Sequence, residues 1–155
     1  MTGAPLPKTR ADRLRLLWKL GNRTESLQIR LFGFSGMSLL RKTPVLLLET
    51  TGRRTGRRHR TGVAYWRLAE EIFIGGGAGG MTRVDWVANL RAHPAATVWI
   101  RRQRTQVVAR ELVGPEYERA RSQAFEIWPN VAEYERASGR RIPYFSLSAA
   151  NEARN

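Results

Sequence analysis

The sequence predicts an α+β fold that is mainly β: a small barrel with peripheral helices. Five or six segments have the length and the apolar, β-branched or aromatic content of strands. Short turns join several of them, and strands and helices do not alternate in the βαβ rhythm of a doubly wound sheet. With 155 residues and 42% hydrophobic content, the chain can build one well-cored domain. We expect a lead-in over residues 1–42, the domain over 43–148 and a polar tail over 149–155.

The expected elements follow from local patterns and from the residues that interrupt them. Strands are predicted at 44–50, 63–66, 71–74, 96–100, 106–113 and 142–147, with a hairpin across the polar turn 101–105. Helices are predicted at 82–93 with Thr82 as N-cap, at 116–127 after Pro115, and at 131–138 before Gly139.

The N-terminal segment 10–21 reads as a basic amphipathic helix, since Leu14, Leu17 and Trp18 recur at helical spacing. Two interpretations remain open: its apolar stripe packs on its own domain, or it contacts an anionic membrane surface. No apolar stretch approaches the roughly 20 residues of a membrane span. The expectation is a cytoplasmic protein, with peripheral membrane association as the alternative.

Composition narrows the possible partners. The chain holds 27 Lys and Arg against 13 Asp and Glu, a formal net charge of +14, which favours anionic partners. Cysteine is absent, which removes disulfides, thiol catalysis and thiolate metal ligands. With two histidines only, a histidine-based zinc site is not expected either, so we predict no metal.

The segment 50–60 leads out of the first strand and contains two glycines and five arginines. Glycine allows positive φ and a close approach to the backbone, and each guanidinium offers a planar fork of donors to phosphate or carboxylate. If the chain is extended beyond Gly56, Arg58 and Arg60 share one face and His59 and Thr61 the other. The segment therefore predicts an anion pocket, with a solvated basic loop as the alternative.

A second glycine-rich segment, 75–80, has five glycines in six residues at the end of a strand. Such a backbone can present several N–H donors to a phosphate or a flat ring. The alternative is a flexible surface loop. No Gly-Lys-Ser/Thr follows, which argues against an ATPase or GTPase.

The predicted helix 82–93 carries Trp86 and Asn89 three positions apart on one face. An aromatic ring beside an amide can stack on, and hydrogen-bond to, a ring system, although ordinary packing explains the pair equally well. The buried side is assigned to the apolar residues Val84, Val87, Ala88 and Leu90.

Taken together, the order of motifs resembles the deazaflavin-dependent nitroreductase family. The resemblance covers about Val45 to Leu147 and rests on Leu-Leu-Glu-Thr-Thr-Gly-Arg-Arg-Thr-Gly, the basic strand, the glycine-rich turn, Trp-Val-Ala-Asn-Leu and Arg-Arg-Ile-Pro. It implies a split β-barrel related to flavin-binding oxidases. It also implies coenzyme F-420, a deazaflavin with a phosphate and an oligoglutamate tail, as donor in two-electron reductions of quinones, nitroaromatics and enones.

The resemblance also implies roles for individual residues. Phosphate and tail binding falls on Arg53, Arg54 and Thr55, and the deazaflavin lining on His59, Arg60, Thr61, Gly62, Val63 and Ala64. Further cofactor contacts fall on Gly75, Gly76, Gly77, Ala78, Asp85, Trp86 and Asn89. The substrate pocket falls on Trp128, Val131 and Tyr134.

The expected reaction moves a hydride from reduced F-420 to a small-molecule acceptor, and the cofactor carries the chemistry. Tyr134 or water supplies the proton; the sequence does not decide between them. Three alternatives remain: a barrel that binds FMN, haem or fatty acid, a nucleic-acid binder, and a non-catalytic carrier. No recognisable nucleic-acid module is found, so nucleic acid is not expected as a partner. An oligomer is compatible with the sequence.

Overall fold

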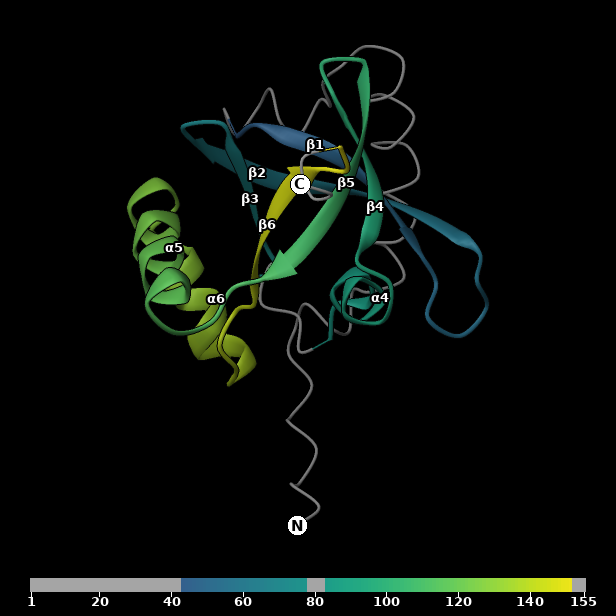
Figure 1. The fold of residues 1–155 in the computed structure, drawn as a ribbon. Helices are drawn as coiled ribbons and strands as arrows, with labels where there is room; N and C mark the ends of the chain where they lie inside the picture. Colours follow the sequence, from purple (N-terminus) through teal and green to yellow (C-terminus); the bar gives the residue numbers. More distant parts are fainter. Residues whose placement is uncertain (1–42, 78–82, 152–155) are drawn as a thin grey trace.

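A computed structural model describes residues 43–77 and 83–151; the predicted helix at 10–21, Thr82 and Ala78 lie outside these ranges. Six antiparallel strands close into a barrel in the order β1-β2-β3-β6-β5-β4 (Figure 1). The strands are β1 (Val45–Thr51), β2 (Arg58–Leu68), β3 (Glu71–Gly75), β4 (Ala95–Ile100), β5 (Gln103–Glu111) and β6 (Tyr144–Ala149). The helices are α4 (Asp85–Ala92), α5 (Gly114–Ile127) and α6 (Val131–Ser138). The predicted barrel with peripheral helices is confirmed.

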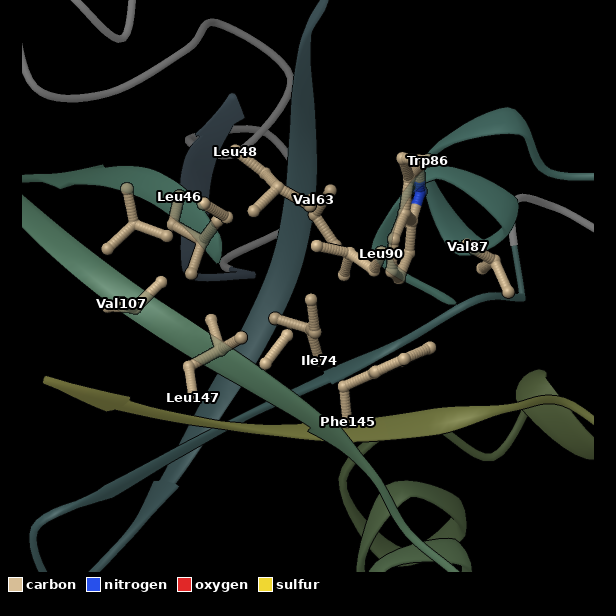
Figure 2. Close-up of a cluster of buried hydrophobic side chains, with 13 residues drawn as sticks. Leu46, Leu48, Val63, Ile74, Trp86, Val87, Leu90, Val107, Phe145 and Leu147 are labelled. Carbon is tan, nitrogen blue, oxygen red and sulfur yellow. The ribbon is translucent and has the colours of Figure 1, made fainter. Parts of the chain in front are cut away.

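The barrel interior is filled by the inward-facing residues of all six strands. Along β1, Leu46 and Leu48 point inward and are fully buried, as the alternation of side chains along a strand requires. Figure 2 shows Trp86, Val87 and Leu90 of α4 reaching into the same cluster beside Phe145. The short helix α4 therefore closes one end of the barrel.

A second apolar layer lies on the outer face of the barrel, under α5 and α6. Trp66 of β2, Phe73 of β3 and Tyr144 of β6 form this layer with Ala120 and Ala124 of α5. The ring of Trp66 lies 5.5 Å from Phe73 and 5.8 Å from Tyr144 between centroids, and its indole N–H donates to Gln123 Oε1 at 3.1 Å. In Figure 1 the two helices lie together on one side of the barrel.

Several predicted boundaries need correction, among them β5, which spans Gln103–Glu111 instead of 106–113. The hairpin between β4 and β5 is present, but its turn is only Arg101 and Arg102, whose φ angles of 46° and 71° are left-handed. Two-residue hairpin loops favour such angles because their twist matches the twist of the strands. The last strand begins at Tyr144 instead of Ile142, since Pro143 has no N–H to donate to a ladder.

The start of α4 was also predicted wrongly. The N-cap is Val84, which makes no side-chain capping bond, and Asp85 is the first helical residue instead of the third. A carboxylate in the first turn still complements the helix dipole. By contrast, α6 has the predicted bounds, and its C-cap Gly139 adopts the left-handed φ of 65° that favours glycine. Within the described ranges, no helix is long and apolar enough to span a membrane.

Candidate cofactor-binding site

The arginine turn is a compact hairpin connection between β1 and β2. Gly52 N donates to Arg57 O at 2.7 Å, and Gly56 N donates to Gly52 O at 2.9 Å. Gly56 has a φ of 65°, and a Cβ on Gly52 would lie 2.8 Å from Nε2 of His59. The left-handed backbone angle favours glycine at position 56, whereas a larger residue at position 52 would require the exposed His59 side chain to move.

Two of the arginines fold back onto one carboxylate. Glu49 is only 4% exposed, and it accepts hydrogen bonds from Arg58 Nη1 at 2.8 Å and Arg60 Nε at 2.7 Å. Burial by itself raises the pKa of the Glu49 carboxyl, but the hydrogen bonds and charges of Arg60 and Arg58 outweigh it and lower the pKa below its ordinary value. As predicted, Arg58 and Arg60 share a face, but both form salt bridges with Glu49, which neutralises part of their charge.

Arg53 is held in place by α4. Its backbone N–H donates to Asn89 Oδ1 at 3.1 Å, and its Nη1 lies 3.5 Å from the same oxygen and 4.0 Å from Asp85 Oδ1. The side-chain amide of Asn89 in turn donates to Thr50 Oγ1 at 3.2 Å. Only 24% of the Arg53 side chain is exposed, so this guanidinium has a defined position at the base of the turn.

Arg54 and Arg57 complete the charge of the turn. Both are exposed, and neither guanidinium forms a hydrogen bond or ion pair with residues 43–77 or 83–151. Thr55 lies between them and accepts a hydrogen bond from the Arg57 backbone N–H at 3.3 Å. The cations available to an anionic ligand are therefore Arg53, Arg54 and Arg57, whereas the sequence pointed to Arg60 in place of Arg57.

The residues predicted to line a ring divide between the two faces of β2. Val63 is in the barrel core, so His59 and Thr61 share the inner face with it. The remaining three face outward, and they are Arg60, Gly62 and Ala64. A flat ligand on one face cannot contact all six side chains; those on the inner face lie on the same side of β2 as Thr50 and Asn89.

The glycine segment is shaped by packing. A Cβ on Gly75 would lie 2.8 Å from the ring of Tyr144, and one on Gly76 would lie 2.7 Å from Val87 Cγ2 and 2.9 Å from Pro143 Cγ. Both backbone polar groups of Gly76 form hydrogen bonds. Its N–H donates to Pro143 O and its carbonyl accepts from Arg140 Nη2, each at 2.8 Å. Glycine is required here by neighbouring side chains, whether or not a ligand is bound.

Arg140 and Pro143 were not predicted as site residues, although both belong to the Arg-Arg-Ile-Pro motif. They fix the start of the glycine segment from the chain that precedes β6. This role depends on the pairing of β3 with β6, which brings the motif next to the glycine segment and which a single sequence does not show.

The predicted substrate-pocket residues lie around the outer apolar layer. Trp128, Val131 and Tyr134 are partly buried against it, and the ring of Trp128 meets Trp66 edge-on at 5.8 Å. Tyr134 Oη accepts a hydrogen bond from Asn130 Nδ2 at 2.6 Å, which leaves its own proton free to donate. A Cβ on Gly77 would lie 3.6 Å from Tyr134 Cδ2, so the structure brings Tyr134 and the glycine segment together.

Trp86 and Asn89 share a face of α4, as predicted, but this face is the buried one. Trp86 is 7% exposed and its ring lies 5.9 Å from Phe145, while Ala88, assigned to the buried side, is partly exposed. The reason is that α4 closes the barrel end and presents its largest apolar side chain to the core. Trp86 is thus a packing residue with little free ring surface. Among the described residues, no group of three or more His, Asp or Glu is placed to hold a metal.

The fold and the site define a split-barrel protein with a cationic turn between β1 and β2, suited to an anionic cofactor. The chain belongs to the F-420H(2)-dependent quinone reductase family, whose model matches residues 22–148. It is therefore an F-420-dependent oxidoreductase.

Solved structures agree with this assignment. A structure described as an F-420-H2-dependent reductase (FDR-A) is 28% identical with a TM-score of 0.61, over 68% of this chain and 94% of that one. A second, described as a domain-swapped dimer, has the same identity and TM-score over 68% of this chain and 80% of that one. A haem-binding protein from Mycobacterium smegmatis, 18% identical over 72% of this chain and 48% of its own, shares the fold with a TM-score of 0.54.

Proposed function

We propose that this protein reduces a quinone with reduced F-420 as the electron donor. The observation that carries the proposal is the arginine turn, where Arg53 is held by α4 while Arg54 and Arg57 are exposed beside it. One phosphate needs one or two such cations, and a carboxylate-rich tail can engage the rest. FMN has no carboxylate tail, so the turn favours F-420 over FMN.

The residues of this chain would position the two reactants. Arg53, Arg54 and Arg57 would bind the anionic part of the cofactor, and the segment from Gly75 to Gly77, which lies beside Tyr134, would contact its ring. Bound reduced F-420 supplies a hydride from its ring. Trp128 and Val131 offer apolar surface to the acceptor. The acceptor classes considered are quinones, enones and nitroaromatics.

Tyr134 is proposed to hold the proton that completes reduction of the acceptor. Its hydroxyl accepts from Asn130, so its hydrogen points elsewhere. We expect Tyr134→Phe to lower kcat by about 100-fold, the lower range for a general acid, with a small change in KM. An unchanged kcat would assign the proton to water.

The proposal is tested by parallel titrations with F-420 and FMN, followed by turnover of a quinone, an enone and a nitroaromatic with reduced F-420. Micromolar or tighter binding of F-420 and quinone turnover are the expected results. Binding of F-420 without turnover of any acceptor would indicate a carrier, and preference for FMN would remove the proposed donor. The same titration with Arg57→Ala should show weaker F-420 binding that depends on tail length.

A further inference from the structure

We propose that Asn89 is a positioning residue that fixes the arginine turn in its anion-binding conformation and acts on the cofactor through Arg53. This inference rests on the function proposed above. Asn89 is 4% exposed, although its side chain is polar and lies on a helix that faces an apolar core. A buried amide needs hydrogen-bond partners, and the partners of Asn89 are Thr50 and Arg53, on either side of the point where β1 ends.

The amide is committed to the turn on both sides. Oδ1 accepts from the backbone N–H of Arg53 at 3.1 Å, and Nδ2 donates to Thr50 Oγ1 at 3.2 Å. Thr50 is still in β1, whereas Arg53 lies beyond its end. Asn89 therefore spans the point where the chain leaves the barrel, and it links the turn to a helix anchored in the core by Trp86 and Leu90.

Direct contact between Asn89 and a ligand fits these observations less well. Its oxygen already accepts from Arg53, its nitrogen already donates to Thr50, and almost none of its surface is open. The same bond occupies the Arg53 backbone N–H. What Arg53 can offer a ligand is thus its guanidinium, whose Nη1 lies 3.5 Å from Asn89 Oδ1.

This arrangement divides the cations by how firmly they are placed. Arg53 is fixed by Asn89 and by Asp85 at 4.0 Å, while Arg54 and Arg57 are exposed. A phosphate at a fixed distance from a ring is best bound by a fixed cation, because little conformational entropy is lost on binding. A tail of variable length is better served by mobile side chains. We therefore assign the phosphate to Arg53 and the tail to Arg54 and Arg57.

The test is a double-mutant cycle on cofactor affinity, with the phosphate-bearing deazaflavin that lacks glutamates as the probe. Asn89→Ala and Arg53→Ala should each weaken its binding by about tenfold, the equivalent of one hydrogen bond to a charged group. If Asn89 acts through Arg53, the double variant should bind about as weakly as Arg53→Ala alone. A double variant weakened by the product of the two single effects would overturn the proposal.

Binding of the deazaflavin core without phosphate is the control, because a general loss of structure would weaken it too. Its affinity for Asn89→Ala should equal its affinity for the wild type, because only the turn is loosened. An equal loss for core and phosphate-bearing form would overturn the proposal. If Asn89→Ala does not fold, Asn89→Asp keeps the acceptor for Arg53 but adds a negative charge beside its guanidinium. Asn89→Asp should lower the affinity for the phosphate-bearing deazaflavin and leave the affinity for the core unchanged. An unchanged affinity for the phosphate-bearing form would contradict the positioning role.

Gln123→Ala is the matched control. It removes the partly buried side chain that accepts from the Trp66 indole at 3.1 Å, in the layer under α5 and away from the turn. We expect lower stability and unchanged affinity. A loss of affinity equal to that of Asn89→Ala would assign both effects to destabilisation. If the wild type itself does not bind F-420, the proposed function fails; if it binds and Asn89→Ala binds equally well, only the inference fails.

Discussion

Glu49 shows how one carboxylate changes what a run of arginines can do. The five arginines between residues 53 and 60 look equivalent in the sequence, but two of them form ion pairs with this buried side chain. An unpaired buried carboxylate would be costly, so the chain supplies two guanidiniums to it. The charge left for a ligand is concentrated at the tip and base of the turn, where no described carboxylate other than Asp85 is placed to compete.

Glu49→Gln is expected to lower the free energy of unfolding by about 1–3 kcal/mol at pH 7. The loss is moderate because the arginines, 67% and 41% exposed, regain water when the carboxylate is removed. The folded-state pKa of Glu49 is lowered, so its stabilisation is complete above the unfolded-state pKa and is lost as pH falls through the folded-state pKa. Urea unfolding at pH 7 and at pH 3 should therefore show the two proteins converging in acid; a pH-independent gap would contradict this role.

Tyr144→Phe is expected to stabilise the protein. The Tyr144 hydroxyl is buried and has no hydrogen-bond partner within residues 43–77 and 83–151. Burial, with a smaller contribution from the charge of Glu135, raises the pKa of this phenol, so it stays neutral. Removing an unsatisfied hydroxyl should add about 1 kcal/mol to the free energy of unfolding. Tyr117→Phe is the control, because its hydroxyl donates to Ile142 O at 2.9 Å and its loss should destabilise. Equal effects of the two changes would refute the argument.

At the scale of elements, local patterns located the strands and helices of the described ranges, with errors at their ends. Short apolar runs bounded by turn residues gave β1 and β3 almost to the residue, and Gly139 marked the end of α6. The buried face of α4 was assigned wrongly, because helical periodicity locates a stripe but not the element that it faces. The roles of Arg140 and Glu49 could not be predicted either. Both depend on contacts between segments that only the closed barrel brings together.

The glycine segment gives a prediction about packing between α4 and β6. Gly76→Ala should cost about 1–3 kcal/mol, because the new Cβ would meet Val87 Cγ2 at 2.7 Å and Pro143 Cγ at 2.9 Å. In the Val87→Ala background, Gly76→Ala should cost less than in the wild type, since one of the two clashes is removed. Gly56→Ala is a useful comparison: nothing lies within 4 Å, so its cost should reflect only the φ of 65°. Thermal unfolding of Gly76→Ala, Val87→Ala, their double variant and Gly56→Ala measures these costs. Strictly additive stability losses at positions 76 and 87 would exclude the clash.

For the whole molecule, the question is whether the net charge of +14 or the local turn attracts the cofactor. Leu47 pairs with Trp99 and Glu49 with Thr97, so β4 runs away from the arginine turn toward Arg101 and Arg102. At about 3.3 Å per residue, the two tips are roughly 25 Å apart, and Figure 1 shows the β1–β2 and β4–β5 turns at separate edges of the barrel. This exceeds the Debye length of about 8 Å at physiological salt.

Replacing Arg101 and Arg102 by Glu changes the net charge by two at each position, from +14 to +10, and leaves the arginine turn between β1 and β2 unaltered. At about 0.15 M salt we expect F-420 affinity to change less than twofold, because the distant charges are screened. At about 0.01 M salt, where the Debye length reaches about 30 Å, the association rate should fall for the long-tailed cofactor. Arg54→Ala, with a smaller change in net charge, should weaken affinity at both salt concentrations. Stopped-flow association and equilibrium titration separate these effects. A larger loss at 0.15 M from the distant pair than from Arg54→Ala would mean that total charge, and not the geometry of the turn, governs cofactor binding.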